Sequence, residues 1–349
     1  MQRIITLSIL VVVLCGMVAW PATAQQKLAQ TGMKFLAVGT DARAVALGEA
    51  VTSVEGTSSS LFFNPAAMAR ISGFTSISVG QTKWIADIKH NFGSIAFSPF
   101  DGEYGVIGFM LQAVDYGEFE GTVRATNEKG YLDNSDIPGL NFKPSALMFG
   151  FGYARALSDK FSLGAGVKYV QQNLGDAINS LTDDGSVIYN PDGTPYKLSN
   201  KSKVLAFDFG ILYHTGFKSL NFGMTVRNFS NEARFQNEGF QLPLTFRIGL
   251  SMNVLDLTDL DKEMHSFLVT FDAEHPRDFQ EQLKIGGEYT FMKILSLRIG
   301  YVSPADEHGV VYGVGLQKMM DNLGLGIDYA YTPCGIFGNV HRFSFQFSY

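Results

Sequence analysis

The residues best suited to chemistry in this chain form one dense acidic cluster beside a histidine. The cluster comprises Asp272, Glu274, His275 and Asp278. A carboxylate within reach of an imidazole can exchange a proton with it, so these residues are a candidate acid/base site. The same residue types also suit a solvated loop surface or a contact with a divalent cation, and we favour this second interpretation.

No motif of a known catalytic or metal site accompanies the cluster. The six histidines include no His-Glu-x-x-His spacing, and the chain has no Gly-x-Ser-x-Gly elbow. We therefore predict that the protein is not an enzyme, with no catalytic residue, no bound cofactor and no metal site.

A second set of charged residues lies at alternate positions of largely apolar segments. These residues are Lys168, Asp208, Arg227, Arg247, Asp272, Lys284, Glu288, Arg298, Asp328 and Arg342. Their mixed sign favours ion pairing over an ion-selective ring, because buried charges are tolerated when they are paired and hydrogen-bonded. We expect a charge network that locks the interior of the protein together, and a polar conduit is the alternative.

The elements that carry these charges are predicted to be membrane strands. At the end of the chain, an aromatic face formed by Phe343, Phe345, Phe347 and Tyr349 alternates with polar residues. Successive side chains of a strand point to opposite faces, so one face suits lipid and the other a polar lumen. About fourteen such segments occur, an even number as in bacterial barrels. They start near residues 74, 91, 105, 145, 161, 203, 219, 243, 265, 282, 295, 310, 323 and 341.

These observations predict an all-β fold, a transmembrane antiparallel β-barrel over residues 74–349. A soluble β-sandwich with the same alternation would expose a very large apolar surface. Charged residues make up 17% of the chain, below the roughly 25% of globular proteins. The net charge of −6 excludes nucleic acid as a partner, because no basic stripe is present to neutralise phosphates.

The N-terminus has the pattern of an export signal. Arg3 precedes an apolar run from residue 4 to Trp20, and Ala22-Thr23-Ala24 is a site that a signal peptidase cleaves. We expect residues 1–24 to be a cleaved signal peptide and the mature protein to reside in the bacterial outer membrane.

Residues 25–73 do not alternate and are predicted to form a plug, or hatch. Thr40 can cap a short helix over residues 41–48, and Asn64 followed by Pro65 begins a second helix that runs to Arg70. Inward glycines of the barrel would leave room for these helices. The glycines have an alternative explanation, which is that they ease strand curvature.

Several phrases resemble the PorV/PorQ family of outer-membrane proteins, related in architecture to the FadL-type fatty-acid transporters. They are residues 35–43 with residues 47–50, then Asn64-Pro65-Ala66, and the strand phrases at residues 286–289, 297–301 and 327–331. The resemblance implies a fourteen-stranded barrel that acts in type IX secretion as a shuttle or attachment-complex partner. Its plug motif corresponds to Asp41, Arg43, Asn64, Pro65 and Ala66. The Asn-Pro-Ala match is closer to generic members than to the dedicated shuttle.

Two functions therefore stand as hypotheses. The first is a scaffold or shuttle that holds secreted proteins or secretion-system components at the cell surface, and the second is a FadL-like channel for hydrophobic solutes. A channel should have an apolar pocket continuous from loops to plug, whereas a scaffold should have a sealed lumen. Outer-membrane lipid and the barrel-assembly machinery are expected partners in both cases. The assembly signal would be the aromatic face of Phe343, Phe345, Phe347 and Tyr349.

Overall fold

The computed structural model describes residues 31–124, 130–133, 135–136, 140–178, 188–194, 196–236, 238–305 and 309–349. The predicted signal peptide, residues 1–24, and the first part of the predicted plug, residues 25–30, lie outside this part of the chain. Among the described residues, no helix is both long and apolar enough to cross a membrane.

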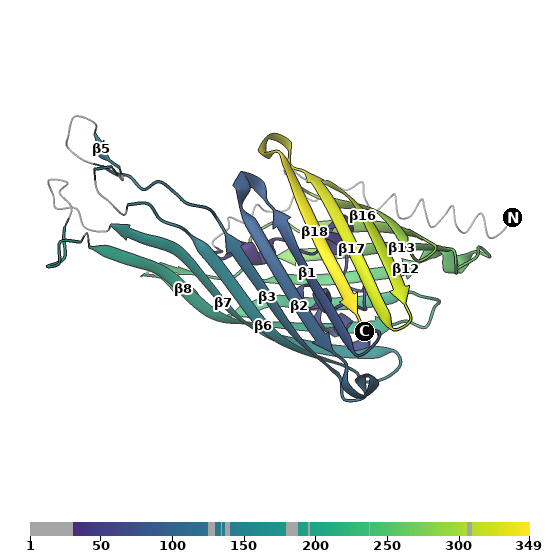
Figure 1. The fold of residues 1–349 in the computed structure, drawn as a ribbon. Helices are drawn as coiled ribbons and strands as arrows, with labels where there is room; N and C mark the ends of the chain where they lie inside the picture. The colour runs from purple at the N-terminus through teal and green to yellow at the C-terminus, as the bar shows by residue number, and fades with distance from the viewer. Residues whose placement is uncertain are drawn as a thin grey trace.

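Fourteen antiparallel strands close into a barrel, which confirms the predicted fold class and strand number (Figure 1). The barrel strands are β1 (Thr75–Lys83), β2 (Lys89–Phe97), β3 (Val106–Asp115), β6 (Ser145–Ala156), β7 (Phe161–Ile178), β8 (Lys197–His214), β9 (Asn221–Ser230), β12 (Thr245–Asn253), β13 (His265–Pro276), β14 (Gln282–Phe291), β15 (Leu295–Ser303), β16 (Val310–Met320), β17 (Leu323–Pro333) and β18 (Asn339–Ser348). The barrel closes where β1 pairs with β18, from Ser76 with Ser348 to Lys83 with His341. Closure removes the exposed strand edges that lipid cannot hydrogen-bond.

Side chains alternate along the strands between an outer face, which suits lipid, and an inner face, which is buried in the filled interior. Phe343, Phe345 and Phe347 of β18 are 43%, 52% and 36% exposed, whereas Ser344 between them is fully buried. The same alternation on the other strands places Phe, Leu, Ile and Tyr on the outer surface. This surface would be a very large apolar patch in water, and it suits a bilayer.

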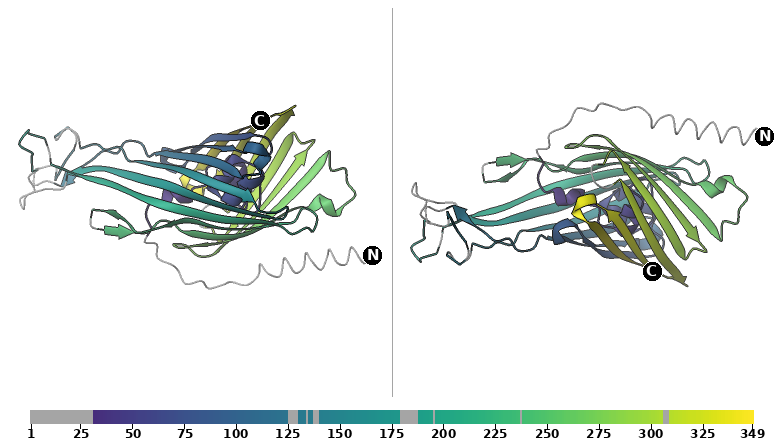
Figure 2. Two further views of the ribbon diagram at one scale, coloured as in Figure 1. Left: turned by 90° about the horizontal axis from the view of Figure 1, so that it is seen from below. Right: turned by 90° about the horizontal axis from the view of Figure 1, so that it is seen from above.

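The N-terminal segment passes through the inside of the barrel (Figure 2). Its helical turns are η1 (Lys34–Ala37), α2 (Ala42–Ala46), η2 (Ser58–Phe62) and η3 (Pro65–Arg70). At one end, Gly32 N donates a hydrogen bond of 3.0 Å to Gln241 O, in the connection between β9 and β12. At the other end, the chain leaves the interior and enters β1. We call these the loop end and the turn end of the barrel, and residues 31–73 the plug.

The helix caps of the plug differ in one place from the prediction. Asp41, and not Thr40, caps α2, because its side chain accepts a hydrogen bond from Ala44 N. The helix ends at Ala46, earlier than predicted, and the chain turns at Gly48, where φ is +65°. Asn64 caps η3 by accepting from Ala66 N, with Pro65 in the first turn.

Strands β7 and β8 form a hairpin that projects beyond the rest of the barrel at the loop end (Figure 1). Each has 18 residues, so the paired strands continue beyond the apolar alternation that the sequence shows. The apolar alternation does not predict these strand ends, because it stops beyond the membrane. There, both faces of a two-stranded ribbon can be polar. Two short hairpins, β4 (Val123–Arg124) with β5 (Tyr131–Leu132) and β10 (Ala233–Phe235) with β11 (Glu238–Phe240), also lie at this end.

Candidate functional site

The inner wall of the barrel carries glycine where the plug passes. A Cβ added at Gly164 of β7 would overlap the backbone of Pro65 and Ala66, and one at Gly210 of β8 would overlap Asn64. The same holds for further pairs of wall and plug residues: Gly223 with Thr52, Gly286 with Leu47, Gly300 with Gly48, and Gly313 with Ala46. These glycines therefore provide room for the plug, which is one of the two explanations that the sequence left open.

Polar side chains hold the plug backbone on strands that lack such glycines. The hydrogen bonds run from Ala42 N to Ser344 Oγ of β18 (2.7 Å), from Ser58 N to Ser76 Oγ of β1 (3.0 Å) and from Thr52 N to Asp272 Oδ2 of β13 (3.0 Å). Because an unpaired buried N–H is costly, these bonds help to fix the path of the plug. The plug is thus in direct contact with the wall around most of its circumference.

Glu49 of the plug is the centre of one charge cluster that joins the plug to the wall. Its Oε2 lies 3.0 Å from Arg247 Nη2 of β12 and 3.2 Å from Lys284 Nζ of β14. Both cations also pair with Glu274 of β13. Burial alone would raise the pKa of Glu49, but the attraction of Lys284 and Arg247 outweighs it and lowers the pKa below its usual range. Glu49 is therefore a carboxylate that ties the plug to the wall.

Arg43 makes the second attachment of plug to wall. Its Nε and Nη2 donate to the two oxygens of Glu288 at 2.9 and 2.8 Å, a bidentate geometry. Glu288 also binds Arg298, whose Nη1 lies 2.6 Å from Asp328 Oδ1. The attraction of Glu288 raises the pKa of Arg43, so this guanidinium stays charged. The chain of charges links α2 to β14, β15 and β17.

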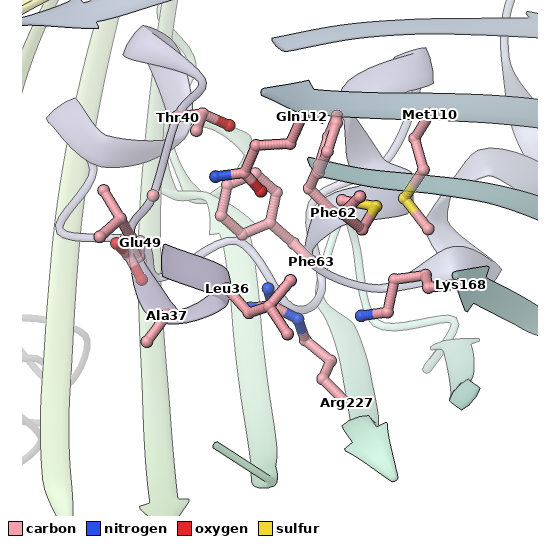
Figure 3. Close-up of a pocket in the computed structure, with 13 residues that line it drawn as sticks. Leu36, Ala37, Thr40, Glu49, Phe62, Phe63, Met110, Gln112, Lys168 and Arg227 are labelled. Atoms are coloured by element: carbon pink, nitrogen blue, oxygen red, sulfur yellow. The ribbon is translucent and has the colours of Figure 1, made fainter. Parts of the chain in front are cut away.

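Three further predicted inward charges, Lys168, Asp208 and Arg227, lie on β7, β8 and β9. Lys168 pairs with Asp208 at 2.7 Å and donates to Asn228 at 2.6 Å. Arg227 lies over the ring of Phe63 at 5.7 Å and has no ion pair among the described residues. In Figure 3, Lys168 and Arg227 lie on one side of a small pocket and Glu49 on the other, with Phe63 between them. The volume of this pocket is about 10 Å³. This volume admits about one water molecule.

The acidic cluster that opened the sequence analysis is divided between different environments. Asp272 and Glu274 point into the lumen and are 0% and 7% exposed, whereas His275 points outward and contacts Glu281. Asp278 lies at the loop end and binds Thr31 and Lys34 of the plug. The four side chains do not converge on one point. Among the described residues, no group of His, Cys, Asp and Glu is arranged to hold a metal ion.

A larger cavity of about 450 Å³ lies above the plug at the loop end. Its floor is formed by plug residues that include Val45, Gly48 and Glu49, and its mouth by Ile85, Phe279, Ala305 and Phe337 of four different connections between strands. Its volume lies within the range of small-ligand sites, about 300–1,000 Å³. The packing of Gly48 and Leu47 against β15 closes it from below.

Sequence reasoning missed two residues of this interior. Glu49 lies in the plug, outside any alternating pattern, and the only signal was a carboxylate facing a lumen rich in inward cations. Trp84 directly follows β1, and its ring lies 5.2 Å from the guanidinium carbon of Arg342. No sequence pattern predicts that contact, because the two residues are brought together by barrel closure between β1 and β18.

The fold resembles that of solved toluene transporters. The Ralstonia pickettii toluene transporter TbuX superposes with a TM-score of 0.55 at 11% identity, over 89% of this chain and 97% of that one. The Pseudomonas putida toluene transporter TodX gives a TM-score of 0.53 at 14% identity, over 93% and 98% of the two chains. At this identity the likeness shows the fold alone. No curated protein matches the chain.

The family is shown by a separate match over residues 122–348, nearly two thirds of the chain. The matched family is described as the type IX secretion system membrane protein PorP/SprF. The match begins before β5 and runs through β18, so it covers the long hairpin, most of the barrel wall and the inward charges of β7 to β18. The match does not show the PorV/PorQ family that the sequence phrases resemble. The chain belongs to the PorP/SprF family of type IX secretion system membrane proteins.

Proposed function

We propose that this protein is a sealed outer-membrane scaffold that holds secreted proteins or secretion-system components at the cell surface. The observation that carries the proposal is the fit between plug and wall. Plug backbone lies directly on wall glycines, and the Glu49 and Arg43 clusters tie it to five strands. A lumen filled in this way favours attachment over passage.

The loop end provides the surfaces that attachment requires. The β7–β8 hairpin projects from the barrel, and Ile336 and Phe337 at the β17–β18 connection are 88% and 54% exposed. Exposed apolar side chains beside a rim of polar loops are typical of protein interaction sites. Long loops face outward in bacterial barrels, so we assign the loop end to the cell surface and the turn end to the periplasm.

The proposal includes the route by which the protein reaches the membrane. Residues 1–24 direct export and are removed, residues 25–73 form the plug, and residues 74–349 form the barrel. The barrel-assembly machinery reads the aromatic face of β18, formed by Phe343, Phe345, Phe347 and Tyr349. The protein is not an enzyme and acts through binding. Whether it works in the manner of PorV/PorQ-type shuttles is decided by the partners it retains.

Affinity purification from native membranes tests the scaffold function. We expect a tagged protein to retain secreted proteins or secretion-system components after mild detergent extraction. A variant without residues 179–196, which connect β7 to β8 in the sequence, should insert normally and lose those partners. Recovery of the barrel with no partner from either strain would contradict the proposal.

A FadL-like channel for hydrophobic solutes is the second candidate, favoured by the cavity of about 450 Å³ at the loop end and by the transporter-like fold. It predicts uptake of a hydrophobic solute by proteoliposomes that contain the protein. Under the scaffold proposal, such proteoliposomes take up the solute no faster than empty ones.

A further inference from the structure

The cavity at the loop end is lined by one charged group that forms no ion pair among the residues that the structure describes. Arg342 of β18 lines the cavity and is 3% exposed. Its Nε donates to Gly39 O at 3.0 Å and its Nη1 to Thr332 Oγ1 at 2.8 Å, while Trp84 covers one face of the guanidinium. No carboxylate of the described residues lies within ion-pair distance. A buried charge without a partner is costly, which points to a partner supplied from outside.

The carboxylates that line the same cavity are already engaged. Glu49 and Glu274 bind Arg247 and Lys284, and Asp278 binds Lys34. None of these acids pairs with Arg342. Arg342 is therefore positioned for an anion that enters through the mouth, and a guanidinium is the side chain best suited to bind a carboxylate.

The rest of the cavity wall suits an apolar body attached to that anion. Val45, Val302, Val311, Phe279 and Phe337 line it together with the indole of Trp84. An occupant that fits has an apolar side chain next to a carboxylate. The C-terminal residue of a polypeptide has this combination when its side chain is apolar.

The plug residues under the cavity favour the end of a polypeptide as its occupant over a solute that passes through the barrel. An occupant that enters from the loop end meets plug residues Val45, Gly48 and Glu49. Gly48 lies against Gly300 of β15, so the plug obstructs passage further into the barrel. A blind cavity accommodates a chain terminus more easily than a chain that must turn back. We propose that this cavity binds the C-terminal carboxylate and last apolar side chain of a partner polypeptide, with Arg342 as the carboxylate-binding residue. The inference rests on the proposed scaffold function and names its partner chemistry.

The protein contains a natural probe for this binding. Its two tryptophans are Trp20, in the predicted signal peptide, and Trp84, in contact with Arg342. The mature protein in detergent is titrated with an acetylated hexapeptide that ends in phenylalanine with a free carboxylate, and with the same peptide amidated. We expect the free acid to shift Trp84 emission and the amide to bind at least about tenfold more weakly, a loss of roughly 1.4 kcal/mol.

Three variants make the assignment specific, with affinities measured by calorimetry because loss of Arg342 also changes Trp84 emission. Arg342→Gln should weaken the free acid at least about tenfold and leave the amide unchanged. Val311→Phe keeps the arginine but fills the cavity, and should weaken both peptides. Arg277→Gln removes a cation of the same rim that does not line the cavity, and should weaken neither. Heat-dependent gel mobility verifies that each barrel is folded.

Equal affinity for acid and amide, undiminished binding by Arg342→Gln, or absence of peptide binding would each overturn the inference. Saturation by a long-chain fatty acid without peptide binding would do the same and would favour the solute channel. These failures are distinguishable from failure of the scaffold function. If Arg342→Gln still retains native partners in the affinity purification, the scaffold stands and the partner binds elsewhere.

Discussion

The plug level of the barrel and the loop-end cavity above it differ in how closely they are packed and in whether their charged side chains form ion pairs. At the plug level, wall glycines contact plug backbone, and the plug charges Glu49 and Arg43 meet opposite charges on the wall. Above it, a cavity of about 450 Å³ is open, and Arg342 forms no ion pair with any residue that the structure describes. The lower region is built to stay closed, and the upper region is built to receive something.

The difference teaches where to look for function in a filled barrel. Paired charges in a packed interior are explained by the need to hold the plug, so they carry little information about ligands. An unpaired charge beside open space has no such explanation. Each prediction below perturbs one of the two regions and uses the other, or a neighbouring site, as its reference.

The largest effect is expected from removal of the plug. Deleting residues 25–70 should leave a membrane-inserted barrel with high conductance, because the wall at that level presents Gly and Ser to the lumen. The intact protein should conduct little. Single-channel recording in planar bilayers measures both. An inserted deletion variant with no greater conductance would show that the plug is not what closes the lumen.

Loss of Glu49 should be the most destabilising single substitution of those considered. Glu49→Ala leaves Arg247 and Lys284 to share Glu274, and removal of one partner of a buried ion pair costs about 3–5 kcal/mol. Denaturant unfolding in detergent measures the loss. Glu55→Ala is the reference, since its partner His214 is charged only when protonated and the pair is more exposed, so it should cost much less. Equal losses would mean that the Glu49 cluster does not hold the plug.

Two glycines of β7, Gly164 and Gly166, can test whether the inward glycines provide room for the plug or ease strand curvature. A Cβ at Gly164 would overlap the backbone of Ala66, whereas a Cβ at Gly166 would meet only wall atoms, Phe151 O at 3.4 Å and Asp208 Cβ at 3.9 Å. Gly164→Ala should cost about 1–3 kcal/mol, as overpacked sites do, and Gly166→Ala should cost less than 1. Unfolding midpoints of the two variants give the comparison. Equal costs would favour strand curvature as the role of both glycines.

The sequence predicts the barrel far better than the cavity. Alternation locates thirteen of the fourteen strand starts within two residues, because membrane strands must repeat their lipid-facing side chains. Only β8 departs strongly, starting at Lys197 and not near residue 203, since its first residues lie beyond the membrane. The inward position of Arg342 was predictable in the same way. Its lack of a partner was not, because pairing depends on strand register and on the path of the plug.

The smallest effect is expected where the plug reaches the loop end. Lys34 and Thr31 hold the carboxylate of Asp278. Burial raises the pKa of Asp278, but the hydrogen bonds from Lys34 and Thr31 outweigh it, so the pKa is lower than usual. A lowered pKa means that the contact stabilises the folded protein above about pH 3.9, the unfolded value, and that this contribution disappears as the pH falls through the folded value.

Asp278→Asn should therefore lower stability at pH 7 by about 0.2–1 kcal/mol, the range of exposed pairs, because half of the Lys34 side chain is in solvent. The difference between the variant and the natural protein should shrink below about pH 4. Unfolding in detergent at pH 7, 5 and 3.5 measures it, with Lys34→Gln as the matched substitution on the other partner. A larger loss, or one that persists at the lowest pH, would mean that the loop end is locked as tightly as the Glu49 cluster. The cavity would then be part of the seal, and the contrast between the two regions would fail.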